Sequence, residues 1–70
     1  MARFNFSHGR QTHIISFTWV DRTSASYPAT FDSDEDAIQA ARTEAREIRC
    51  APCNIRVERF RGAVIYNAKD

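Results

Sequence analysis

The chain has 70 residues, and its ten basic and nine acidic side chains leave a net charge of +1. A chain this short forms one domain with a small core, because only about 60% of its unfolded surface can be buried, and this leaves little room for a catalytic site with its supporting residues. The near-neutral charge argues against a general DNA-binding field, and no apolar run approaches the roughly 18 residues of a membrane helix.

The N-terminal third is predicted to form strands. Phe4 and Phe6 alternate with polar residues, and residues 8–10 are typical of a turn. Residues 11–20 are rich in β-branched and aromatic side chains, which favours a strand. The start of the chain lacks the apolar segment of a signal peptide, so we expect a cytoplasmic protein.

A polar loop is expected over residues 21–26, followed by a short strand over residues 27–31. Pro28 has no backbone N–H to donate, so this strand should lie at a sheet edge.

The clearest element is a helix over residues 34–50. Ser33 is a typical N-cap, with Asp36 three residues later in a capping-box-like position, and the acidic first turn complements the helix dipole. Pro52 prevents the helix from continuing. One apolar face follows from helical spacing: Ala37, Ile38, Ala41, Ala45 and Ile48.

After the helix, Cys53, Ile55 and Val57 alternate with polar residues, and a turn at residues 61–62 leads into a last strand over 63–68. The order β-β-(β)-α-β-β predicts an α+β fold. We expect a mainly antiparallel sheet of four to five strands with one helix packed on one face, formed by a single domain over residues 1–70.

Strand alternation assigns side chains to two faces of the sheet. The helix-facing set is Phe4, Phe6, Ile15, Phe17, Trp19, Ile55 and Val57. The open face carries Arg3, Asn5, Ile14, Ser16, Thr18, Val20, Arg56 and Phe60. Its mixture of apolar, hydroxyl and arginine groups suits recognition or burial in a dimer, although antiparallel sheets commonly have one solvated side. The oligomeric state is left open.

Cys50 and Cys53 form a C-x-x-C motif at the end of the predicted helix. Redox motifs of this kind begin a helix, whose N-terminal dipole stabilises the thiolate, so a redox role is disfavoured. Together with His8 and His13, the two cysteines have the ligand types of a zinc site. The alternative is a pair of partly buried free thiols at a helix-to-strand junction.

No nucleophile elbow of the Gly-x-Ser-x-Gly type is present, and the chain has two glycines in all. We therefore expect no enzymatic activity and no cofactor.

Nine of the ten basic residues are arginine, whose guanidinium group can bind carboxylate or phosphate with two hydrogen bonds. Arg42, Arg46 and Arg49 lie at helical spacing on one side of the helix, and three more arginines fall on the last hairpin. A solvated helix face with intrahelical ion pairs is the alternative. The candidate binding residues are Arg42, Arg46, Arg56, Arg59 and Arg61.

The segment FDSDEDAIQAAR at residues 31–42, followed by IRVERFRGAVIY at residues 55–66, resembles small phage anti-CRISPR proteins and small bacterial and phage proteins that combine a sheet with one helix. The similarity lies in the helix-then-hairpin layout and covers about residues 28–68. It implies a protein that binds CRISPR effector complexes and carries over no individual binding residue.

We therefore expect a small non-enzymatic binding protein that occupies a macromolecular surface, with a phage-type inhibitor of a host CRISPR or other nucleoprotein complex as its most concrete form. The partner would be a protein or nucleoprotein complex, and no membrane. One alternative is a nucleic-acid-binding module that uses the same arginines. Another is a zinc-stabilised structural domain.

Overall fold

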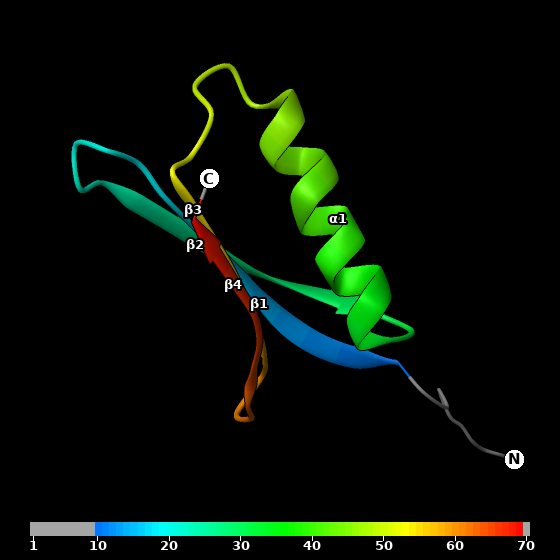
Figure 1. Ribbon diagram of the computed structural model, residues 1–70. Helices are drawn as coiled ribbons and strands as arrows, with labels where there is room; N and C mark the ends of the chain where they lie inside the picture. Colours follow the sequence, from blue (N-terminus) through cyan, green and yellow to red (C-terminus); the bar gives the residue numbers. More distant parts are fainter. Residues whose placement is uncertain (1–9, 70) are drawn as a thin grey trace, which may run out of the picture.

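The computed structural model describes residues 10–69. Four strands and one helix follow one another as β1 (Gln11–Thr18), β2 (Ser24–Phe31), α1 (Asp34–Glu47), β3 (Asn54–Arg59) and β4 (Val64–Lys69) (Figure 1). The predicted α+β class, with one helix on an antiparallel sheet, is confirmed. The strand expected around Phe4 and Phe6, together with His8 and Gly9, lies outside the described residues.

The sheet has the order β2-β1-β3-β4, and every neighbouring pair is antiparallel. β1 and β2 form one hairpin, and β3 and β4 form the other. The helix connects the two hairpins, because the chain leaves β2 at one edge, runs through α1 over one face, and returns as β3 beside β1 (Figure 1).

The register places the predicted faces correctly in the two central strands. Ile15 pairs with Val57, and Phe17 pairs with Ile55. All four side chains are buried beneath the helix, as the alternation of apolar and polar residues predicts. On the opposite side, Ser16 pairs with Arg56, so the expected open face is confirmed at this pair.

The helix begins as predicted. The Ser33 hydroxyl accepts a hydrogen bond from the backbone N–H of Asp36 at 3.1 Å, and three acidic residues occupy the first turn. Ala37, Ala41 and Ala45 are buried against the sheet. Their small side chains let the helix backbone lie close to the strands.

The helix ends at Glu47, three residues earlier than predicted, because Ile48 has an extended backbone conformation (φ −74°, ψ 139°). Residues 48–53 return the chain from the end of the helix to β3 in the sheet. Within this connection Pro52 is buried, and the Cys53 N–H donates to the Thr18 carbonyl at 2.8 Å.

The predicted loop over residues 21–26 is wrong in its second half, since β2 begins at Ser24. Residues 24–26 pair with the end of β1, and the hairpin turn is shortened to residues 19–23. Arg22 adopts a positive φ of 74° to close this turn. The predicted edge position of residues 27–31 is confirmed.

A polar contact joins β2 to the helix at the side of the core. The Tyr27 hydroxyl donates a hydrogen bond to the Glu44 carboxylate. Burial, and next the hydrogen bond to Glu44, raise the pKa of Tyr27 well above its usual value. Within residues 10–69, no helix has the length and apolar character needed to cross a membrane.

Candidate functional site

A groove forms on the helix side of the sheet because the helix is too narrow to cover all four strands. The helix packs mainly over β3, β1 and β2, and β4 lies at the edge of the sheet beyond β3. Tyr66 and Ala68 of β4 pair with Val57 and Ile55, so they belong to the helix-facing side. They remain partly exposed and form the floor of the groove.

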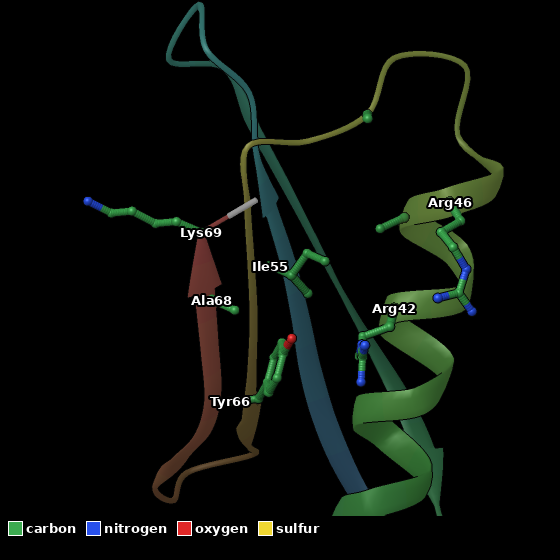
Figure 2. A pocket seen from close by; sticks show the side chains of 8 residues that line it. Arg42, Arg46, Ile55, Tyr66, Ala68 and Lys69 are labelled. Carbon is green, nitrogen blue, oxygen red and sulfur yellow. The ribbon is translucent and has the colours of Figure 1, made fainter.

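The groove has a volume of about 490 Å³. We call it the α1–β4 groove; its lining residues are Arg42, Ala45, Arg46, Ala51, Ile55, Tyr66, Ala68 and Lys69. Figure 2 shows the two arginines on the helix wall and the Tyr66 ring on the opposite side, while the Lys69 amine points away from the groove. The floor is thus small and apolar, and one wall is cationic.

The two helix arginines carry charge that no described side chain neutralises. Arg42 and Arg46 are both exposed. The ion pairs within residues 10–69 involve four other basic side chains: Arg10, His13, Arg56 and Arg59. Because guanidinium groups form their strongest contacts with carboxylates and phosphates, the groove wall is suited to bind an anionic group.

The three hairpin arginines are in different surroundings. Arg59 is bound to Asp34, its Nε lying 3.2 Å from both carboxylate oxygens, with a further hydrogen bond from its terminal nitrogen. Arg56 lies 3.5 Å from Glu58. The guanidinium carbon of Arg61 lies 5.1 Å from the centre of the Phe60 ring. The structure therefore brings two of the five predicted binding residues to one groove and places the other three elsewhere.

Asp34 is the centre of a polar cluster that the sequence did not predict. The Nε2 atom of His13 lies 3.0 Å from Asp34, and its Nδ1 atom lies 3.1 Å from the carbonyl oxygen of Gln11. Both ring nitrogens therefore lie within hydrogen-bonding distance of an oxygen atom. The His13 side chain is completely buried.

The surroundings of Asp34 favour its charged form. Hydrogen bonds from Arg59, and then from His13, lower the pKa of Asp34 from 3.8 to about 2. Arg59 is correspondingly held protonated, since its pKa is raised by the same carboxylate. This cluster joins the start of α1 to β1 and β3, so Arg59 takes part in holding the fold together. Strand alternation alone could have placed His13 on the buried face, but not beside Asp34.

The cysteines lie at the opposite end of the helix from His13. Cys53 binds the last residue of β1, whereas His13 is five residues earlier in that strand, a separation of about 17 Å along a strand. His13 therefore does not converge with the two thiols, and His8 lies outside the described residues. Within residues 10–69, no cluster of three or more potential ligands could hold a metal ion.

Both thiols are free. Cys53 is partly buried as expected, whereas the expected burial of Cys50 is wrong, since this residue is exposed. Both thiols lie in the connection that follows the helix, at the position expected for thiols at a helix-to-strand junction. The Trp19 indole N–H donates to the Cys50 carbonyl at 2.6 Å and ties this connection to the first hairpin turn.

Comparison with known protein families, with curated protein sequences and with solved structures finds no match to this chain.

Proposed function

We propose that this protein is a non-enzymatic binding protein that holds an acidic macromolecular surface in the α1–β4 groove. The observation that supports this function is the pair Arg42 and Arg46, which lie one helical turn apart beside an apolar floor and have no carboxylate partner within residues 10–69. Arg42 and Arg46 would act as the anchors, and Tyr66 would supply contact area.

An acidic protein fits this surface better than a long nucleic acid. Binding along a phosphate backbone uses an extended basic stripe, whose affinity comes from the release of many counterions. Here two arginines share one groove, while Arg59 is neutralised by Asp34 at the other end of the helix. The exposed carboxylates of Glu35 and Asp36 at that end would repel a phosphate chain lying along the helix. The inhibitor of a CRISPR or other nucleoprotein complex stays a prediction, as a particular case of this function.

The proposal is tested by selecting binders from a displayed library of random 12-residue peptides. We expect the selected peptides to be enriched in Asp and Glu. Their affinity should fall by about tenfold or more in the variant Arg42→Glu/Arg46→Glu, because each charge-assisted contact contributes about 1.5–3 kcal/mol and is replaced by repulsion.

Two single variants, Arg49→Glu and Arg61→Glu, serve as controls because neither residue lines the groove. Both should retain the affinity of the wild type within about threefold, the range expected for surface changes outside a contact. Selected peptides without acidic enrichment, or equal losses in Arg61→Glu and in the double variant, would contradict the proposal. A 20-base-pair DNA duplex that binds more tightly than every selected peptide at 150 mM salt would replace it with the nucleic-acid alternative.

A further inference from the structure

The edge of β4 beside the groove offers backbone hydrogen-bonding groups in addition to the two arginines. Among residues 10–69, β4 has β3 as its one paired neighbour. The pairing contains a bulge between Val57 and Glu58, so Ile65 has no direct partner, but residues 66–69 pair regularly with 57–54. In an antiparallel strand every second residue directs its N–H and C=O away from the existing partner. A regular edge of four residues therefore lies next to the groove.

The direction of β4 lets a new strand run alongside the helix. The two figures show α1 and β4 running in the same general direction (Figures 1 and 2), and both elements contribute residues to the lining of the groove. A strand added to this edge would extend the groove floor, and every second side chain would face the side of the sheet that carries Arg42 and Arg46.

The spacing of the arginines matches such a strand. Arg46 lies four positions after Arg42 in the helix, which is an axial rise of about 6 Å. Side chains at positions i and i+2 of an extended peptide lie about 6.8 Å apart on the same face. Two acidic residues with one residue between them can therefore each meet one arginine. Acidic residues at helical spacing, or phosphates on a flexible chain, do not combine this match with pairing to a strand edge.

We propose that the partner is an extended acidic peptide segment, with Asp or Glu at alternate positions, that adds to β4 as a fifth strand. This inference rests on the proposed function and specifies the partner of the same groove. Backbone pairing to residues 66–69 would supply affinity, and the alternating carboxylates would supply specificity, as in other cases of strand addition.

The first test is the pattern in the selected 12-residue peptides. We expect Asp and Glu enriched at i and i+2, with β-branched or aromatic residues between them. Enrichment at i and i+3 or i+4 would indicate a bound helix and would overturn the inference, as would acidic residues with no preferred spacing.

The second test uses two versions of the tightest selected peptide, N-methylated on alternate sets of backbone amides. Strand addition uses the N–H groups of one set only, so one version should bind about tenfold more weakly or worse, and the other should bind nearly as well as the parent. Equal affinities for the two versions would overturn the inference. The proposed function would still stand if the acidic parent peptide remained sensitive to Arg42→Glu/Arg46→Glu, so the two failures are distinguishable.

Hydrogen exchange of the full chain completes the experiment. Saturating parent peptide should increase the protection of backbone amides within residues 66–69, while the protection of amides in the other edge strand, β2, should be unchanged. Protection confined to the helix would overturn the inference. So would a dimer, seen by sedimentation without peptide, in which residues 66–69 are already protected, because a second copy would then occupy the edge.

Discussion

At the scale of single residues, the most informative group is the cluster of His13, Asp34 and Arg59. It explains why a fully buried histidine is tolerated, because its two ring nitrogens lie 3.1 and 3.0 Å from acceptors. The cluster also gives Arg59 a role in the stability of the fold, because its ion pair with Asp34 connects β3 to the first turn of the helix. A charged cluster with mutual hydrogen bonds predicts a specific dependence of stability on pH.

We expect Asp34→Asn to lower the free energy of unfolding at pH 6 and to have little effect at pH 2. The pKa of Asp34 is lowered in the folded state from 3.8 to about 2, chiefly by Arg59 and then by His13. The unfolded chain therefore binds the proton more tightly, so the stabilisation is fully present above about pH 4 and is lost as the pH falls towards 2. Urea unfolding between pH 6 and pH 2 measures the difference in the free energy of unfolding between the wild type and the variant. A difference that stays constant over this range would contradict the stabilising role of the Asp34 carboxylate.

Tyr27→Phe should lower the free energy of unfolding by about 0.5–1.5 kcal/mol, because it removes a partly buried hydrogen bond to Glu44 while keeping the ring. Tyr66→Phe is the matched control. Its hydroxyl points into the groove (Figure 2), so we expect a change within about 0.5 kcal/mol. Chemical denaturation compares the two variants, and a greater loss for Tyr66→Phe would refute this account of how β2 is fastened to the helix.

At the scale of elements, the alanine face sets the distance between the helix and the sheet. Ala37 and Ala41 are fully buried. Ala41→Leu should cost about 1–3 kcal/mol, because the added carbons have no space at this contact. Gln39→Leu, on the exposed side of the same helix, should change stability by about 0.5 kcal/mol or less. Thermal unfolding compares the stability of the two variants. Equal losses of stability in Ala41→Leu and Gln39→Leu would mean that the helix is not closely packed at Ala41.

Features that depend on neighbouring residues were predictable from the sequence. The ends of elements that depend on distant parts of the chain were not. The helix start at Ser33 follows from capping and from the acidic first turn, both of which act within a few residues. The early end at Glu47 depends on how far the chain must travel to reach β3. The start of β2 at Ser24 likewise depends on pairing with β1, since residues 24–26 have a composition typical of a loop.

At the scale of the whole molecule, the candidate site could be predicted in part. Helical spacing put Arg42 and Arg46 on one side of the helix. The floor of the groove could not be predicted, because it depends on β4 being the strand that the helix leaves uncovered. The ion pair of Arg59 could not be predicted either, because its partner Asp34 is 25 residues away in the sequence. The fold thus places Arg42 and Arg46 in the groove and Arg59 in the stabilising cluster. It places Arg56 on the open face of the sheet and Arg61 in the last turn.

The resulting charge distribution separates two ends of the helix. The N-terminal end carries the acidic first turn, and Arg46 lies in the last turn beside the groove. This arrangement complements the helix dipole. Under the proposed function, an acidic partner would be attracted to the α1–β4 groove and repelled by the acidic first turn, although the net charge of the chain is only +1.

The most direct measurement is an NMR titration of the arginine Nε–Hε groups with the tightest acidic peptide from the library. We predict that the signals of Arg42 and Arg46 shift with saturation. The signal of Arg59, which already donates to Asp34, and that of Arg61, which lies in the last hairpin turn, should stay in place. Shifts at Arg61 with none at Arg42 and Arg46 would contradict the assignment of the groove as the binding site.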